Sequence, residues 1–258
     1  MIALLGNLAR DLFPDRPPAP GGAPYHAARA LRSIDTPGVI YARCAEEDRE
    51  ELVPPVARLG TPVRYVPGRS TASFLIAYEG HVRSMGVEAA GDTWLPEDVP
   101  ELPPRVRWVH VAPLLRSDFP AGTLAAIARG RRLSLDGQGL VRAPELGPLR
   151  LDADYDPAML AHVAVLKLAE EEAEVLGDPA ALPVPEVLVT HGPVGATVYA
   201  EGRCEHVHAF EVDADPTGAG DAFSIAYVAA RAAGLPPMTA ARRATGVVAE
   251  MLAASLVP

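Results

Sequence analysis

Short apolar segments alternate with longer alanine-rich segments along most of this chain. The short segments are rich in Val, Leu and Ile, which is typical of strands buried on both faces of a parallel sheet. The longer segments repeat their apolar residues at helical spacing. The pattern predicts an α/β fold with helices on both faces of a mostly parallel sheet. The predicted strands are residues 2–5, 39–44, 108–112, 133–136, 163–168 and 187–190, and the predicted helices are residues 23–33, 46–59, 121–129 and 170–176.

Two β-rich segments break this alternation. Residues 71–88 form two runs joined at Glu79-Gly80, inserted between the early strand–helix units and the rest of the chain. An isolated hairpin is marginal in water, so we expect this hairpin to pack on the rest of the protein. The alternative interpretation is an ordinary surface hairpin. Residues 196–210 form a second hairpin with its turn at Glu201-Gly202, expected at the sheet edge.

Composition limits the number of domains and the kinds of partner. With 258 residues, 49% of them hydrophobic, the chain can build one substantial core, so we expect a single domain over residues 1–258. The net charge of −10, without a Lys/Arg cluster, argues against nucleic-acid and membrane partners and favours small-molecule ligands. Two distant cysteines, Cys44 and Cys204, and no signal peptide lead us to expect a cytoplasmic protein with reduced thiols.

Residues 215–221 read Asp-Pro-Thr-Gly-Ala-Gly-Asp and lead directly into a long apolar segment with helical character. Because glycine has no Cβ, the backbone at Gly218 and Gly220, with Ala219 between them, can approach a ligand closely. The first N–H groups of the following helix and its positive dipole end both attract phosphate. The motif therefore predicts a phosphate-binding turn at the start of a helix.

Asp221 ends this motif, and a carboxylate beside a phosphate repels the ligand unless it has a chemical task. Accepting the proton of an attacking hydroxyl is such a task. In phosphoryl transfer that proton leaves late, so a weak but well-placed base suffices. The alternative is that Asp221 caps the helix while the glycines form a tight turn. Aspartates at both ends of the motif and the long helix after it favour the phosphate interpretation.

The motif resembles the C-terminal signature of the ribokinase-like (PfkB) carbohydrate kinase family. The resemblance implies a ribokinase-like three-layer sandwich, with a small β lid inserted at about residues 61–92. It also implies that Asp221 is the catalytic base and that the backbone of Gly218, Ala219 and Gly220 forms the anion hole. Asp215 and Thr217 would then flank the nucleotide phosphates or a monovalent cation such as K⁺.

Polar and glycine residues after the first strand are candidates for binding the acceptor. Asn7 and Asp11 follow a parallel strand at its carboxyl end, where open α/β sheets bind ligands, and their side chains suit vicinal hydroxyls. The dinucleotide fingerprint Gly-x-Gly-x-x-Gly is absent, which argues against an oxidoreductase. The family resemblance implies that Asp11 holds substrate hydroxyls and that Gly21 and Gly22 allow close approach. His26 stands where the family often has Asn, so no role is assigned to it.

Residues 136–142, Asp-Gly-Gln-Gly-Leu-Val-Arg, narrow the resemblance. They are similar to a segment of the myo-inositol-kinase-like branch of the family, which also has a counterpart of residues 166–173. Asp136 and Arg142 would then face the phosphates or the substrate. A turn with a surface arginine is the alternative.

The acidic segment at residues 167–174 resembles the family's Asn-x-x-Glu motif, with Glu172 in the Glu position. The resemblance implies that Glu172 binds water in the shell of Mg²⁺, a metal that keeps several waters. Ala169 departs from the family pattern, because it stands in the Asn position. Complementarity to the helix dipole would alone also explain acidic residues at a helix start.

Residues 190–195 contain Thr190, Gly192 and Gly195 in an arrangement similar to the family's Thr-x-Gly-x-x-Gly turn beside the nucleotide. An ordinary strand-to-hairpin turn has the same pattern. Together the resemblances imply an ATP- and Mg²⁺-dependent phosphotransferase that acts on a hydroxyl of a sugar, a nucleoside or a polyol such as myo-inositol. A homodimer formed through the lid is also expected. The alternative is a catalytically impaired binding or regulatory protein on a kinase scaffold, against which the retained Asp221 argues.

Overall fold

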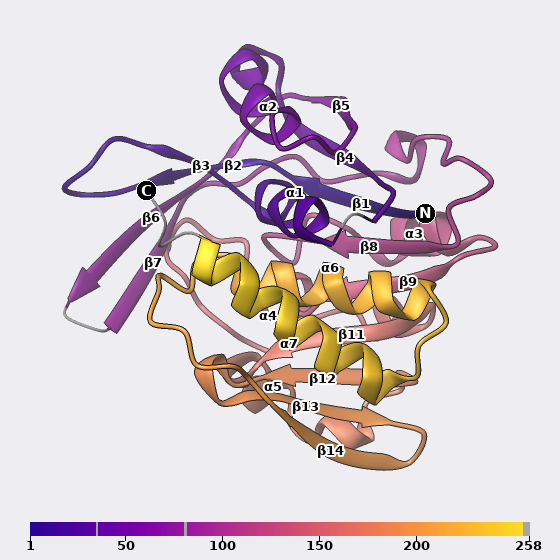
Figure 1. Cartoon of the computed structure of the whole chain (residues 1–258). Coiled ribbons are helices and arrows are strands. Elements are labelled where there is room, and N and C mark those ends of the chain that lie inside the picture. The colour runs from indigo at the N-terminus through magenta and orange to yellow at the C-terminus, as the bar shows by residue number, and fades with distance from the viewer. Residues whose placement is uncertain (35, 80–81, 255–258) are drawn as a thin grey trace.

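A nine-stranded sheet forms the centre of the computed structural model, which describes residues 1–34, 36–79 and 82–254. The strand order is β14-β13-β12-β11-β9-β8-β1-β4-β5 (Figure 1). Strands from β12 to β5 run parallel, whereas β13 pairs antiparallel with β12 and the edge strand β14 pairs antiparallel with β13. The strands are β1 (Ile2–Asn7), β4 (Gly38–Ala45), β5 (Val63–Gly68), β8 (Trp108–Ala112), β9 (Arg132–Asp136), β11 (Val163–Ala169), β12 (Glu186–Thr190), β13 (Gly195–Ala200) and β14 (Arg203–His208).

Helices cover both faces of this sheet, as the sequence pattern predicts. Side chains alternate between the faces of a strand, so Ile2 and Leu4 of β1 join one apolar cluster while Ala3 and Leu5 join the other. Both clusters are buried, which confirms a three-layer α/β arrangement. The first face is covered by α1 (Ala23–Ser33), α2 (Arg49–Ala57), α6 (Ala219–Ala232) and α7 (Pro237–Ala254), and the second by α3 (Ala121–Ala128) and α5 (Glu170–Leu176).

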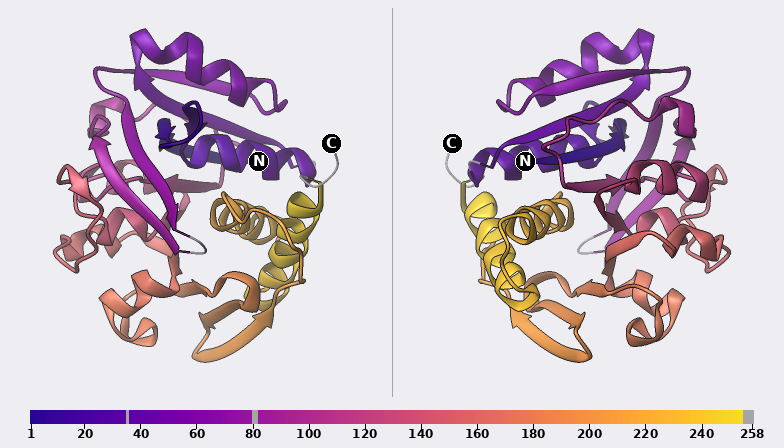
Figure 2. Two further views of the ribbon diagram at one scale, coloured as in Figure 1. Left: turned by 90° about the vertical axis from the view of Figure 1, so that its left-hand side faces the viewer. Right: turned by 90° about the vertical axis from the view of Figure 1, so that its right-hand side faces the viewer.

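A smaller five-stranded sheet lies at the end of the molecule opposite the N-terminus (Figure 1). Its order is β10-β7-β6-β2-β3, and the β6–β7 hairpin crosses the near face in the left view of Figure 2. Phe74, Ile76 and Val87 pack under it against Leu114 and Leu115. The strands are β2 (Ala9–Leu12), β3 (Ala19–Gly21), β6 (Ala72–Glu79), β7 (Val82–Ala89) and β10 (Gly147–Pro148).

This smaller sheet differs from the inserted lid expected at residues 61–92. The hairpin itself is present as β6 and β7, although Gly80 in its expected turn lies outside the described residues. However, β5 belongs to the main sheet, because it pairs in parallel with Ile40–Ala45 of β4. The lid also recruits β2, β3 and β10 from other parts of the chain. These strands have two to four residues, too few for a periodic signal.

Most element ends agree with the sequence pattern. The bounds of α1 and α5 are those expected, and the β13–β14 turn has Glu201 at φ 55° and Gly202 at φ 71°. The segment expected as one helix over residues 46–59 begins as a 3-10 turn and continues as α2. The remaining short elements are α4 (Gln138–Val141) and 3-10 turns at Glu46–Asp48, Pro96–Asp98, Pro157–Leu160, Pro179–Ala181 and Gly192–Val194.

Both cysteines are free, as expected, but only Cys44 is buried, because Cys204 lies on the exposed edge strand β14. A membrane span would need a long apolar helix, and no helix in the described part of the chain qualifies.

Candidate active site

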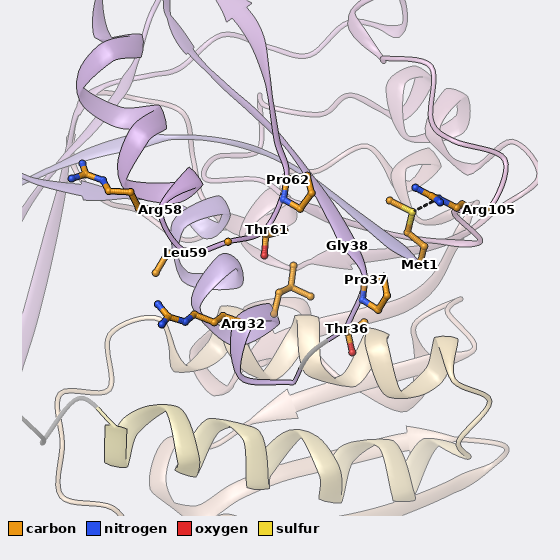
Figure 3. Close-up of a pocket in the computed structure, with 12 residues that line it drawn as sticks. Met1, Arg32, Thr36, Pro37, Gly38, Arg58, Leu59, Thr61, Pro62 and Arg105 are labelled. Carbon is orange, nitrogen blue, oxygen red and sulfur yellow. Dashed lines mark hydrogen bonds between the residues drawn. The ribbon is translucent and has the colours of Figure 1, made fainter.

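One large hollow of the protein lies away from the predicted site residues. It measures about 920 Å³ and opens beside Met1, Pro37 and Gly38, at the amino ends of β1 and β4. Figure 3 shows Arg58 at one end of it and Arg105, which contacts Met1 Sδ, at the other. The arginines do not converge on a common point, and the hollow contains none of the predicted site residues.

The predicted phosphate-binding turn begins α6. Gly218 is the N-cap in a left-handed conformation with φ 82°, and a Cβ at this position would lie 2.2 Å from His26 Nδ1. Glycine is therefore required both by the backbone conformation and by the close approach of His26. Asp215 Oδ1 accepts hydrogen bonds from Thr217 N at 2.9 Å and from Thr217 Oγ1 at 2.7 Å. Asp215 thus shapes the loop that leads into the turn.

A polar cavity of about 100 Å³ adjoins this turn. It brings together residues that are far apart in the sequence: Asp11 comes from β2, Arg142 follows α4, and Phe74 and Met85 belong to the lid. Gly21 leaves room for the Asp11 side chain of this cavity, because a Cβ at Gly21 would lie 2.4 Å from Asp11 Oδ1. Of the predicted site residues, those that line the cavity are Asp11, Gly22, Arg142, Thr217, Gly218 and Asp221.

An apolar cavity of about 340 Å³ adjoins the same turn at Ala219 and Gly220. Its lining has far more apolar than polar surface, and it is built from the segment after β12, the loop before the turn, and α7. The predicted phosphate-binding turn therefore borders a polar and an apolar cavity. The apolar side chains include Phe210, Phe223, Val248 and Leu252, and the predicted nucleotide-side residues Thr190, Gly192 and Gly195 also line it.

Asn7, which the sequence suggests as an acceptor contact, lines neither cavity. Its side chain is buried, Nδ2 donates to Asp92 O at 3.0 Å, and Oδ1 accepts from Trp94 Nε1 at 2.7 Å. Both polar atoms are therefore used to hold the segment that follows the lid. A sequence alone could not reveal this, because Trp94 is more than eighty residues away.

Asp136 and Glu172 are also buried beneath the cavities rather than lining them. Asp136 Oδ1 accepts from Gln138 N at 3.1 Å, and Oδ2 lies 3.4 Å from Lys167 Nζ. Glu172 is 2% exposed, and its Oε2 accepts from Ala169 N at 2.8 Å, which caps α5. Burial raises the pKa of Glu172 even though the charge of Lys167 lowers it. These two carboxylates thus form an internal charge cluster with Lys167.

Lys167 is the member of this cluster that sequence reasoning missed, because it falls within a predicted core strand. Burial alone would lower its pKa, but the carboxylates of Asp136, Glu172 and Asp221 outweigh burial and raise it. The signal available in the sequence was its uniqueness: the chain contains one lysine and 22 arginines. His26 was also left without a role, and it packs against Gly218 and lines the polar cavity.

A family model for pfkB family carbohydrate kinases matches residues 106–255, which is more than half of the chain. This chain belongs to the pfkB family. The match includes the turn that begins α6, the Lys167 cluster and every residue that lines the apolar cavity. It begins after the β6–β7 hairpin, so the lining of the polar cavity in this pfkB protein is only partly covered.

Individual pfkB relatives agree with this assignment. Inositol 3-kinase from Zea mays is 34% identical over 116 residues, which are 43% of this chain and 31% of the maize protein. A pyrophosphate-dependent kinase of the ribokinase family, solved with a pyrophosphate analogue and myo-inositol, superposes with a TM-score of 0.83 at 21% identity, covering 98% of this chain and 95% of that one. Arabidopsis thaliana ribokinase, solved with ribose and ATP, has a TM-score of 0.70 at 18% identity, covering 96% and 91%. The structures show that this pfkB protein has the ribokinase fold.

The described residues of this pfkB protein do not form a dedicated metal site. They contain no group of three or more His, Cys, Asp or Glu side chains placed to hold a metal ion. Glu172 uses one carboxylate oxygen to cap α5, and Ala169 offers no side-chain ligand. The arrangement does not fit Mg²⁺ held directly by Glu172. Its contact with a metal-bound water stays a prediction, as does a monovalent cation beside Asp215 and Thr217.

Proposed function

We propose that this chain transfers the terminal phosphoryl group of MgATP to a hydroxyl of a small acceptor, with a polyol such as myo-inositol preferred over a sugar or nucleoside. The observation that carries this proposal is the position of the turn at residues 218–221, which borders both a polar and an apolar cavity. A phosphoryl group on the turn would have the acceptor on one side and the rest of the donor on the other.

In the proposed reaction, an acceptor hydroxyl in the polar cavity attacks the terminal phosphorus. The new O–P bond forms as the bond between that phosphorus and the bridging oxygen breaks, and ADP leaves with the bridging oxygen. Asp221 takes the hydroxyl proton, while backbone N–H groups at the start of α6 stabilise the transferring charge. Asp11 and Arg142 would orient the acceptor, because carboxylate and guanidinium groups hydrogen-bond hydroxyls well.

The apolar cavity supports a nucleotide as donor. The pyrophosphate-dependent relative raises pyrophosphate as the alternative, because its fold is so similar. Pyrophosphate has no apolar surface, however, and would leave a cavity of about 340 Å³ beside the turn without a function. Aromatic and aliphatic side chains such as Phe223 and Val248 suit a flat purine ring.

The acceptor class rests on the polar lining and on the relatives. The maize relative is an inositol 3-kinase, and one solved neighbour contains myo-inositol. Residues 136–142 resemble the same branch of the family. In this chain Gln138 and Arg142 from that segment line the polar cavity, where they suit an acceptor with several hydroxyls.

The decisive experiment measures phosphorylated product with MgATP or magnesium pyrophosphate as donor and myo-inositol, ribose, inosine or fructose 6-phosphate as acceptor. We expect transfer from ATP to myo-inositol, and an Asp221→Asn protein should lose about 10²- to 10⁴-fold in kcat while still binding ADP. Asp213→Asn, at an exposed position outside both cavities, is the matched control. Transfer from pyrophosphate alone would contradict the proposed donor, and full activity of Asp221→Asn would contradict the mechanism.

A binding or regulatory protein on the kinase scaffold is the second candidate, favoured by Ala169 in the position of the family's Asn. It predicts that calorimetry detects ADP and polyol binding while no acceptor yields product. Turnover with any acceptor in the panel would eliminate it.

A further inference from the structure

Lys167 lies beneath the phosphate-binding turn, near the end of β11. Its side chain is 4% exposed, and a Cβ built on Gly220 would lie 3.3 Å from Lys167 Nζ. The ammonium is therefore in contact range of the first turn of α6. This is the positive end of the helix dipole, where a cation is unfavourable. An anion bound on the turn would relieve that conflict.

The partners of this ammonium leave it able to bind an anion. Within the described residues it makes one ion pair, to Asp136 Oδ2 at 3.4 Å, and no hydrogen bond. A charge-assisted hydrogen bond normally spans about 2.7–2.9 Å, so the pair is loose. Asp136 Oδ2 also accepts no hydrogen bond in the described part of the chain. Since an ammonium carries three N–H donors, Lys167 retains donors for a ligand.

The charge of Lys167 is permanent. The surrounding carboxylates of Asp136, Glu172 and Asp221 raise its pKa despite burial, so it stays protonated at neutral pH. A permanently protonated lysine cannot accept the proton of the acceptor hydroxyl. It can instead offset negative charge on a phosphoryl group, while Asp221 remains the candidate base.

The residue type adds an independent argument. Lys167 is the only lysine in a chain with 22 arginines, so arginine serves at every other strongly basic position. A guanidinium is a broad planar fork, whereas an ammonium is a compact point charge. The Nζ approaches Gly220 so closely that even a Cβ there would be in tight contact. A compact ammonium suits a position this close to the backbone of α6 better than a broad guanidinium does.

We infer that Lys167 is a phosphoryl-binding residue whose ammonium donates hydrogen bonds, from beneath Gly220, to the terminal phosphoryl oxygens of the donor. Asp136 and Glu172 are positioning residues that hold this ammonium against the turn. The ligand class is phosphate, pyrophosphate and nucleoside di- or triphosphates. The inference rests on the proposed function for the identity of the donor, but the predicted anion binding does not require turnover.

The single lysine permits a direct test on the unmodified chain. Protein grown with lysine labelled with ¹³C at Cε and ¹⁵N at Nζ should give one lysine side-chain signal. We expect inorganic phosphate, pyrophosphate and ADP to shift this signal saturably, whereas sodium chloride at matched ionic strength should not. An unchanged signal with all three anions would show the inference to be wrong.

Paired variants separate phosphoryl binding from a purely structural role. Lys167→Met alone leaves Asp136 uncompensated and could unfold the protein, so the test uses Lys167→Met with Asp136→Asn. We expect this double variant to fold and to bind pyrophosphate about 10- to 100-fold more weakly, the loss of one hydrogen bond to a charged group. The control is Arg231→Met with Glu186→Gln, which removes another buried ion pair that is distant from the turn and joins Arg231 Nη2 to Glu186 Oε1 at 2.6 Å. This control should leave the affinity for pyrophosphate within twofold of wild type. Unchanged affinity in a folded Lys167 double variant would overturn the inference.

The two proposals fail in different ways. Phosphoryl transfer in the acceptor panel with an unresponsive lysine signal would refute the role of Lys167 and leave the proposed function intact. A responsive signal without transfer to any acceptor would support the role of Lys167 and refute the proposed kinase activity.

Discussion

The polar and apolar cavities share one turn but are built from the chain in different ways. Asp11, His26, Met85 and Arg142 reach the polar cavity from four separate elements or their ends, spread over more than half of the sequence. The apolar cavity is lined by residues between 190 and 252. The apolar cavity, the proposed donor side, is therefore encoded in one contiguous part of the chain. The polar cavity, the proposed acceptor side, exists only after the lid and the main sheet have come together.

This difference explains what the family comparison covers. The matched segment, residues 106–255, contains every residue that lines the apolar cavity. Most of the polar cavity, including Asp11 and the lid residues Phe74 and Met85, lies before it. The family match thus covers the whole lining of the apolar cavity but only about half of the lining of the polar cavity.

The shared turn should be the most sensitive element, because both halves depend on it. Gly218→Ala places a Cβ 2.2 Å from His26 Nδ1, so the turn must move. We expect kcat/KM to fall about 100-fold for both substrates, the scale of loss for a misplacement of about 1 Å. Gly234→Ala is the matched control, since its φ of 88° imposes similar backbone strain while its Cβ meets nothing within 4 Å. Equal losses in both variants would mean that backbone strain, and not the turn, controls activity.

Filling the apolar cavity should affect the donor alone. Ala249 lines this cavity on α7, and Ala249→Phe should raise KM for ATP about tenfold through steric overlap while leaving KM for the acceptor unchanged. Ala253→Phe, at an exposed position on the same helix, controls for the added bulk. Steady-state kinetics with each substrate varied in turn makes the comparison. An unchanged KM for ATP in Ala249→Phe would show that the donor does not use this cavity.

The complementary change is in the lid. Met85→Phe enlarges a side chain that lines the polar cavity, and we expect KM for the acceptor to rise about threefold, with KM for ATP unchanged. The smaller effect follows from the lid position, where β7 can shift more readily than a helix packed in the core. Ser84→Ala at the exposed neighbouring position is the control. A change in KM for ATP as large as that for the acceptor would contradict separate donor and acceptor cavities.

Sequence reasoning succeeded where the information is local. The glycine turn at the start of α6, α1, α5 and the parallel strands each follow from short patterns of glycine, apolar and polar residues. It missed β2, β3 and β10, because strands of two to four residues become stable only by pairing with distant segments. Asn7 and Glu172 look like ligand residues in sequence, yet both polar side-chain atoms of Asn7 are hydrogen-bonded to Asp92 and Trp94. One carboxylate oxygen of Glu172 accepts from the backbone N of Ala169. Which partner a buried polar group finds is decided by tertiary structure.

The smallest predicted effect is on the pH dependence of the free energy of unfolding, and it arises beside the polar cavity. Asp118 is buried, and its Oδ2 accepts a hydrogen bond at 2.8 Å from the backbone N of Leu114, which lines the polar cavity. Burial raises the pKa of Asp118 to about 7, against about 3.9 for an unfolded chain. Between these values the folded state holds a proton that the unfolded state has lost, so this group lowers the free energy of unfolding as pH rises from about 4 to about 7.

The buried His110 changes the free energy of unfolding in the opposite direction as pH rises. Burial lowers its pKa to about 4, so its contribution to the free energy of unfolding increases between about pH 4 and 6.5. Comparing wild type with Asp118→Asn cancels the His110 contribution, because both proteins contain it. We expect the stability of wild type relative to the variant to fall by up to about 1.4 kcal/mol per pH unit between pH 4 and 7, measured by urea unfolding. A difference that does not change with pH would mean that Asp118 is ionised in the folded protein, and Asp154→Asn controls for the loss of a surface charge.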